Sequence, residues 1–115
     1  VPGGSYTARR VEHRVAGGDA NPYLFLAAVL GSALIGIEDN LKPGAPITGN
    51  AYDQDLPQVP STWADAIEAF DKSPIARRIF DPLLVDNFVL TKRQEMMNFD
   101  QLTPEEQLDL YLDTV

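Results

Sequence analysis

The 115-residue sequence contains no cysteine, which excludes disulfide bonds, catalytic thiols and thiolate metal sites within it. Its single histidine, His13, excludes any site that needs two or more histidine ligands from this sequence. Lysine and arginine together number nine, against 17 aspartate and glutamate residues, so the net charge is −8. This excess of negative charge argues against nucleic acid or an anionic membrane as a partner.

Long hydrophobic runs are also lacking. The longest nearly apolar run, residues 23–37, has 15 residues, whereas a membrane-spanning helix needs about 20. No signal peptide is visible, and a cysteine-free sequence fits a cytoplasmic protein. The sequence starts without methionine, which is compatible with a missing N-terminal part. With 44% hydrophobic residues, residues 1–115 fit a single unit with a core of its own.

Helix-start signals recur along the chain, each a capping residue followed by a proline at the first helical position. They are Asn21-Pro22, Ser73-Pro74, Asp81-Pro82 and Thr103-Pro104, and Thr103 also forms a capping box with Glu106. Thr62, followed by Asp65, is a fifth start. These signals predict helices over about 22–38, 62–71, 73–80, 81–99 and 103–113, with a proline-rich loop over 40–60. Because the first helix is apolar and carries small residues such as Gly31 and Gly36, we expect it to be the most buried.

Residues 6–16 predict a short strand that ends in a turn with two glycines. In a strand, Arg10, Glu12 and Arg14 point to one face and the residues between them to the other. An isolated strand cannot satisfy its own hydrogen bonds, and few other strand candidates exist here, so a sheet outside this sequence is expected to complete it. The predicted fold class is mainly α with a short N-terminal β-strand.

The charged face of this strand holds the sharpest candidates for chemistry. The Glu12 carboxylate is the type of ligand that Mg²⁺ uses together with substrate phosphates. Arg10 and Arg14 are suited to a bidentate grip on carboxylate or phosphate. On the residues alone, simple ion pairing or structural pairing of these three side chains is the preferred reading. His13 is expected to be structural, because it lies on the opposite face.

At these residues the sequence resembles a known family. Arg-x-Glu-x-Arg over 10–14, a glycine turn, and Ala-Asn-Pro-Tyr-Leu over 20–24 before an alanine-rich helix resemble the C-terminal part of the glutamine synthetase catalytic domain. Within this family, the sequence over residues 12–24 is more similar to the branch that joins glutamate to larger amines, of which the γ-glutamylpolyamine (γ-glutamylputrescine) synthetases are members. The resemblance continues through residues 49–52 and 88–95 and covers nearly the whole chain. It implies the C-terminal helical portion of an α+β catalytic domain.

The resemblance also implies an activity, the ATP-dependent ligation of the glutamate γ-carboxylate to ammonia or an amine through γ-glutamyl phosphate. It implies that Glu12 is a ligand of an active-site Mg²⁺ or Mn²⁺. Arg14 would be a catalytic residue that binds the glutamate side-chain carboxylate and its phosphorylated form, and Arg10 would bind ATP. The implied partners are glutamate, ATP, ammonia or an amine, the missing N-terminal part of the same enzyme, and further copies in a homo-oligomer. The 115 residues alone are expected to be inactive.

A reading of a different class also remains open. The chain would then be a non-catalytic acidic helical module for protein interaction or scaffolding. Its exposed strand and its long loop would form the interface, by edge pairing with a partner protein. A well-folded monomer with fully buried apolar surface would favour this reading, whereas a large exposed apolar patch would mark the place of an absent domain.

Overall fold

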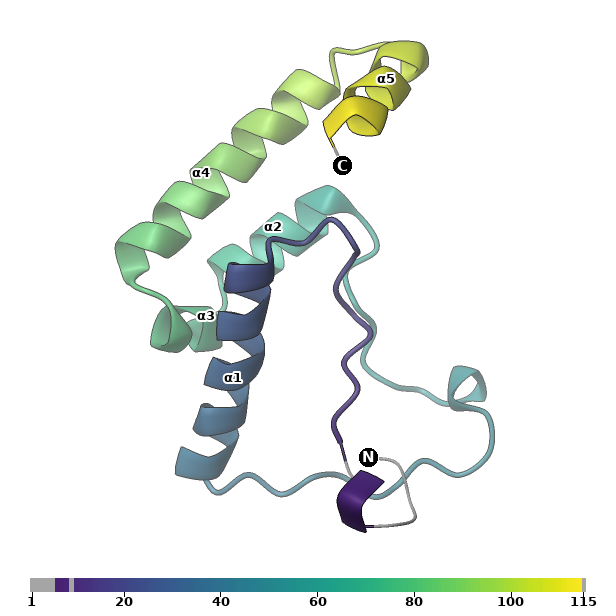
Figure 1. The fold of residues 1–115 in the computed structure, drawn as a ribbon, viewed down its shortest axis with the longest axis vertical. Helices are drawn as coiled ribbons and strands as arrows, with labels where there is room; N and C mark the ends of the chain where they lie inside the picture. Colours follow the sequence, from purple (N-terminus) through teal and green to yellow (C-terminus); the bar gives the residue numbers. More distant parts are fainter. Residues whose placement is uncertain (1–5, 9, 115) are drawn as a thin grey trace.

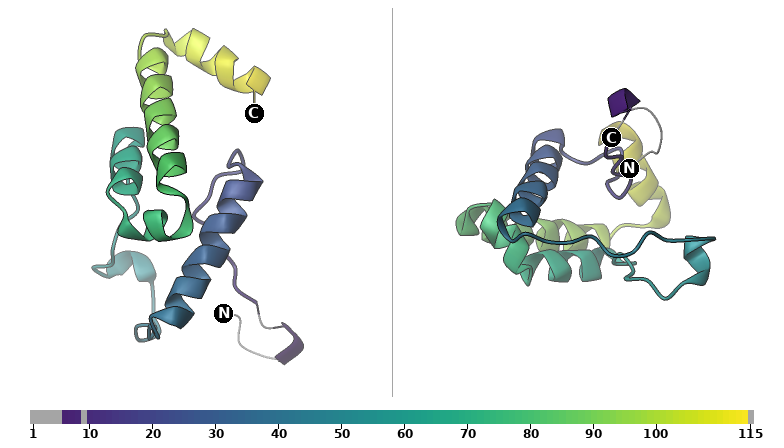
Figure 2. Two further views of the ribbon diagram at one scale, coloured as in Figure 1. Left: turned by 90° about the vertical axis from the view of Figure 1, so that its left-hand side faces the viewer. Right: turned by 90° about the horizontal axis from the view of Figure 1, so that it is seen from below.

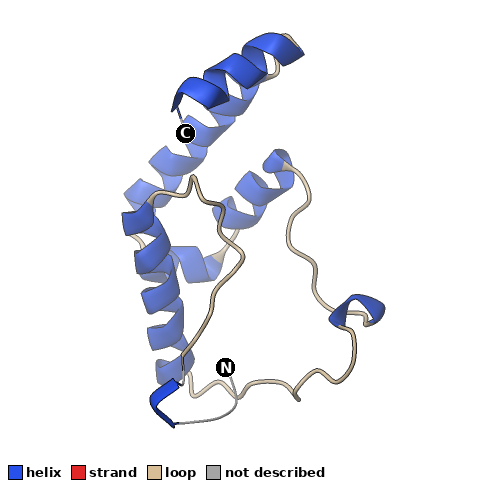
Figure 3. Cartoon of the chain, turned by 45° about the vertical axis from the view of Figure 1, so that its right-hand side comes forward, coloured by secondary structure: helices blue, strands red, loops and turns tan. Residues whose placement is uncertain are grey.

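The computed structural model describes residues 6–8 and 10–114, and the helices follow one another along this part of the chain (Figure 1). The α-helices are α1 (Pro22–Glu38), α2 (Trp63–Asp71), α3 (Pro74–Ile79), α4 (Pro82–Phe99) and α5 (Pro104–Thr114), and short 3-10 turns are η1 (Tyr6–Ala8) and η2 (Ala51–Asp53). Figure 3 shows helix and loop only, and no strand occurs among the described residues. The prediction of a mainly helical chain is therefore confirmed.

Local capping explains where the helices begin. The side chain of Asn21 accepts hydrogen bonds from the backbone N–H groups of Tyr23 and Leu24, at 3.0 and 3.1 Å. Thr62, Ser73 and Asp81 accept equivalent bonds from Asp65, Ala76 and Leu83 at the starts of α2, α3 and α4. At α5 the capping box is reciprocal, since the Glu106 carboxylate accepts from the Thr103 N–H at 2.8 Å.

The core lies between α2 and α4. Ile67 of α2 packs with Val85 and Val89 of α4, and Val85 is fully buried. Aromatic and apolar side chains surround this cluster: Trp63, Phe70, Phe80 and Met96. The apolar spacing of α2, three and four residues apart, thus faces α4, as expected of an amphipathic helix.

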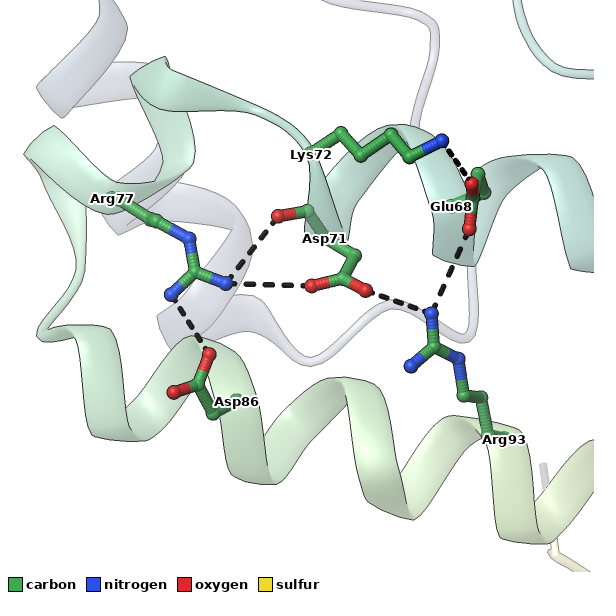
Figure 4. A network of polar contacts seen from close by, with 6 residues as sticks. All are labelled: Glu68, Asp71, Lys72, Arg77, Asp86 and Arg93. Atoms are coloured by element: carbon green, nitrogen blue, oxygen red, sulfur yellow. Dashed lines mark hydrogen bonds and ion pairs between the residues drawn. The ribbon is translucent and has the colours of Figure 1, made fainter.

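Ion pairs join α2, α3 and α4 beside this core (Figure 4). Arg77 of α3 donates to Asp86 of α4 at 2.8 Å and to the carboxylate of Asp71 at 3.3 Å. Asp71 also accepts from Arg93 of α4 at 2.7 Å. Because Asp71 and Arg77 are only partly exposed, this network fixes the three helices relative to one another more firmly than exposed ion pairs would.

Helix α1 packs against α3 (Figure 2). Gly31 provides the close approach, because a Cβ atom at this position would lie 2.6 Å from Ile79 Cγ2. At the end of α1, Arg78 of α3 holds Asp39 with two hydrogen bonds, of 2.6 and 3.0 Å.

The predicted strand over 6–16 is wrong for the described residues. Residues 6–8 form a 3-10 turn, residues 10–16 are irregular and exposed, and position 9 lies outside the described part. The physical reason is that a strand needs a neighbour to pair with its backbone groups. The described part of the chain offers no second strand to this segment.

Helix α1 is also not the most buried helix, contrary to expectation. Ile35 is its one buried residue, whereas α4 contributes Val85 and Val89 to the core. The radius of gyration is 17.5 Å, compared with about 13 Å for a compact domain of this length. The helices therefore form an open arrangement. Among the described residues, no helix combines the length and apolarity that crossing a membrane requires.

Candidate functional site

The structure brings the three predicted site residues together just before α1. Both Nε and Nη2 of Arg14 lie 2.5 Å from one carboxylate oxygen of Glu12. Arg10 approaches the other oxygen of Glu12, at 4.0 Å. Glu12 thus lies between two guanidinium groups although the segment is not a strand, because residues two apart in this segment still share one side.

These side chains lie at the surface. The side chains of Arg10, Glu12 and Arg14 are 63%, 46% and 83% exposed, respectively. An ion pair between exposed side chains is worth only about 0–1 kcal/mol. A carboxylate or phosphate that reached Arg14 could therefore replace Glu12 as its partner at little cost. Ion pairing within the group and ligand binding by the group are thus compatible.

The turn that follows anchors this segment to α1. Ala20 donates to the Gly17 carbonyl at 3.3 Å, and Asn21 then caps the helix. The His13 ring packs against the Phe25 ring of α1, with 5.4 Å between their centroids. The prediction that Asn21 caps the helix is confirmed. His13 contacts an aromatic side chain of the first helical turn, as a structural histidine does.

This site could supply only one of the protein ligands that a divalent metal ion needs. Glu12 offers hard carboxylate oxygens, which suit Mg²⁺ or Mn²⁺. In the part of the chain that the structure describes, no group of three or more His, Cys, Asp or Glu side chains is placed to hold a metal ion. The donor chemistry of Glu12 therefore fits one ligand of such a site, and further ligands would have to come from outside these residues.

Sequence reasoning did not find a hollow of about 790 Å³ beside α4. It is lined by Asp19, Trp63, Lys92, Glu95, Asn98, Phe99, Leu102, Leu110 and Tyr111. Lys92 donates a hydrogen bond to Glu95 there, at 2.6 Å. Both residues lie within the stretch over 88–95 that carries part of the family resemblance, and that stretch was the one sequence feature that pointed to this region. The contribution of Asp19, which follows the glycine turn, depends on tertiary packing and has no local signature.

Comparison with known proteins shows which family this chain is similar to. Residues 1–111 match the family model described as glutamine synthetase, catalytic domain. The glutamate–isopropylamine ligase of a Pseudomonas species is 39% identical over 113 residues, which cover 95% of this chain and 24% of that protein. The γ-glutamylputrescine synthetase of Escherichia coli K12 is 31% identical over 112 residues, or 97% of this chain and 24% of that protein. The glutamine synthetase of Rhizobium meliloti is 34% identical over 113 residues, which cover 90% of this chain and 24% of that protein.

No solved structure matches this chain. The chain spans about a quarter of the length of the curated relatives it matches. The family match, however, covers nearly all of its residues, including the charged segment and all but the end of α5. The chain therefore belongs to the glutamine synthetase catalytic-domain family.

Proposed function

We propose that the full-length protein containing this chain ligates the γ-carboxylate of glutamate to an amine, using ATP and passing through γ-glutamyl phosphate. The observation that carries the proposal is the grouping of Arg10, Glu12 and Arg14 in a chain of this family. Transfer of a phosphoryl group to a carboxylate gathers negative charge, so the reaction depends on positioned cations. Two guanidinium groups on either side of a potential metal ligand meet that need.

Arg14 is proposed to bind the glutamate side-chain carboxylate and its phosphorylated form. Its Nε and Nη2 already converge on one carboxylate oxygen of Glu12. The same N–H groups suit the oxygens of a substrate carboxylate or an acyl phosphate. Arg10, on the other side of Glu12, is proposed to contact the phosphates of ATP, where its charge would offset that of the nucleotide.

Glu12 is proposed to hold Mg²⁺ or Mn²⁺ together with ligands from the rest of the full-length protein. When bound, such an ion neutralises phosphate charge and orients the nucleotide. The single carboxylate available here implies that residues 1–115 supply only part of the site. We therefore expect this chain alone to be inactive. For the full-length protein we propose a homo-oligomeric, cytoplasmic enzyme.

An amine is proposed as the acceptor, with ammonia as the alternative. The support is the motif over 12–24 and the similarity to relatives named for isopropylamine and putrescine. A relative named glutamine synthetase is similarly close in identity. That relative is the basis for keeping ammonia as the alternative acceptor.

The test is an acceptor panel with the full-length protein. Phosphate release in the presence of ATP, glutamate and Mg²⁺ is measured with ammonia, isopropylamine, ethanolamine and putrescine, and the γ-glutamyl product is identified by mass spectrometry. We expect turnover with at least one amine and none with the 115-residue chain alone. Turnover with ammonia only would contradict the amine acceptor, and no turnover with any acceptor would contradict the ligase.

A further inference from the structure

The segment that carries the proposed active-site residues has no regular structure of its own. Residues 10–16 form neither helix nor strand, and each of them is exposed. A backbone of this kind can adopt many conformations, because no helical or ladder hydrogen bonds restrict it. Charged side chains act on a substrate only when they are held close to the productive geometry, and a displacement of about 1 Å is costly. The orientation of Glu12 and Arg14 therefore depends on contacts with a fixed element.

Helix α1 provides such an element through Phe25. The His13 ring contacts the Phe25 ring, with 5.4 Å between their centroids and 59° between their planes, a geometry typical of aromatic pairs that attract each other. Phe25 is half-buried, and its N–H donates to the Asn21 carbonyl at 2.9 Å. Because Asn21 also caps α1, the Phe25 ring stands on a well-fixed turn of helix. His13 lies between Glu12 and Arg14 in the chain, so the contact restrains both neighbours.

The turn between the two rings restrains the segment a second time. Figure 1 shows the chain reversing direction here, so that the segment and α1 run in opposite directions. Ala20 donates to the Gly17 carbonyl at 3.3 Å and closes the turn. The Asp19 carboxylate folds back against Gly17, where it occupies the place that a Cβ atom would need. The ring contact and the turn therefore hold the segment at two points.

The ring contact also fixes which way the charged side chains point. Arg10, Glu12 and Arg14 share one side of the segment, as their ion pairs show. His13, between them, contacts α1 instead. With the imidazole against the helix, the carboxylate and the two guanidinium groups stay at the surface. Loss of the ring contact would free the segment to turn about its own axis, and the charges would turn with it.

We propose that His13 is a positioning residue of the active site, whose ring, held by Phe25, orients Glu12 and Arg14 for the metal ion and the substrate. This inference rests on the proposed function, from which it takes the roles of Glu12 and Arg14. No proton transfer is assigned to His13, so a phenyl ring at this position would serve as well. The competing reading is that the ring contact only stabilises the start of α1.

The test compares variants of the full-length protein. His13→Ala and Phe25→Leu each remove one ring of the pair, the double variant removes both, and His13→Phe keeps an aromatic pair. Tyr111→Leu is the matched control, because it removes a ring contact of similar length, 5.5 Å to Phe99, in another part of the chain. Urea denaturation identifies conditions under which every variant is folded, and the kinetics are measured there.

The first readout is kcat/KM for glutamate, with ATP, Mg²⁺ and the best amine of the panel. We expect His13→Ala and Phe25→Leu to lower it about threefold to tenfold, the factor that one aromatic pair contributes to an equilibrium. The loss should come chiefly from a higher KM for glutamate, since Arg14 is proposed to bind this substrate. The double variant should lose little more than either single variant, and His13→Phe should keep wild-type values.

Tyr111→Leu should lose stability without a change in the KM for glutamate. Three results would each overturn the positioning role: wild-type kinetics in His13→Ala, additive losses in the double variant, or a His13→Phe protein as impaired as His13→Ala. The first of these, combined with a loss of stability, would establish the competing reading.

A second readout does not depend on turnover. The affinity for Mn²⁺ is measured from the EPR signal of the free ion, and Glu12→Gln identifies the binding event in which Glu12 takes part. We expect His13→Ala to weaken this event about threefold to tenfold and His13→Phe to match the wild type. A wild type that forms no γ-glutamyl product would refute the ligase, and the Mn²⁺ affinities would then decide on the positioning role by themselves. Equal affinities in His13→Ala and the wild type would overturn it.

Discussion

Gly31 of α1 and Ile79 of α3 are so close that no side chain fits between them. A Cβ atom at position 31 would lie 2.6 Å from Cγ2 of Ile79 and 3.2 Å from its Cβ. Ile79 is β-branched and stiff at χ1, so it cannot easily move aside. The glycine therefore sets how closely α1 approaches α3.

Replacing this glycine is expected to destabilise the protein. In a helix interior, alanine is favoured over glycine by about 1 kcal/mol, but overpacking costs about 1–3 kcal/mol. Gly36 is the matched control, because its added Cβ would meet nothing within 4 Å. We expect Gly36→Ala to raise the free energy of unfolding and Gly31→Ala to lower it, as measured by urea denaturation.

A second variant identifies the cause. If the contact with Ile79 is responsible, the combined Gly31→Ala and Ile79→Ala substitutions should cost less than the sum of the single changes. Additive effects, or a Gly31→Ala protein as stable as Gly36→Ala, would contradict a close contact between α1 and α3.

The ion pair between Arg78 and Asp39 predicts a pH dependence at the end of α1. Hydrogen bonds from Arg78 lower the pKa of Asp39 below its ordinary value of 3.8. The unfolded chain therefore binds more protons at this site than the folded chain does. The stabilisation that the ion pair contributes is complete above the pKa of Asp39 in the unfolded chain. It is lost as the pH falls through the lower pKa of Asp39 in the folded chain.

NMR titration of Asp39 checks this prediction. In Arg78→Met the pKa of Asp39 should rise towards 3.8, and the stability difference from the wild type should shrink as the pH falls below about 4. Arg93→Met is the control, since Arg93 pairs with Asp71 instead. An Asp39 pKa that is the same in wild type and Arg78→Met would show that the ion pair does not form.

The cap of α1 carries a separate prediction. Asn21 accepts hydrogen bonds from the N–H groups of Tyr23 and Leu24. Asn21→Ala removes this acceptor and should cost about 1 kcal/mol of stability, whereas Asn21→Ser should keep most of it. Urea denaturation measures the two free energies of unfolding. Equal losses in both variants would show that the amide has a role beyond capping.

The candidate site predicts a graded response to substitution. In the full-length protein, Glu12→Gln keeps the shape of the side chain but removes its charge, so it should weaken the apparent affinity for Mg²⁺ and lower kcat. Arg10→Gln should mainly raise the KM for ATP, because Arg10 is proposed to contact the nucleotide. Steady-state kinetics at varied Mg²⁺ and ATP separate these effects. Identical profiles for the two variants would contradict the assigned division of roles.

The features that were predictable from sequence are those with local causes. Capping by Asn21, Ser73 and Asp81 depends on residues within three positions, so the helix starts could be read directly. The grouping of Glu12 with Arg14 follows from their spacing of two. By contrast, neither a strand over the described residues 6–8 and 10–16 nor deep burial of α1 is observed, because strand pairing and helix burial depend on neighbouring segments and not on local sequence alone.

The most direct test of the account is γ-glutamyl amide formation by the full-length protein with and without the Arg14 guanidinium. The wild type, Arg14→Met and the control Arg93→Met are compared with ATP, glutamate, Mg²⁺ and the best amine of the panel. The account predicts that Arg14→Met loses about 10²-fold or more in kcat/KM, the range for loss of one group that stabilises a transition state, while Arg93→Met keeps wild-type activity once folded. An Arg14→Met protein as active as the wild type would contradict the claim that this chain supplies a catalytic arginine to the active site.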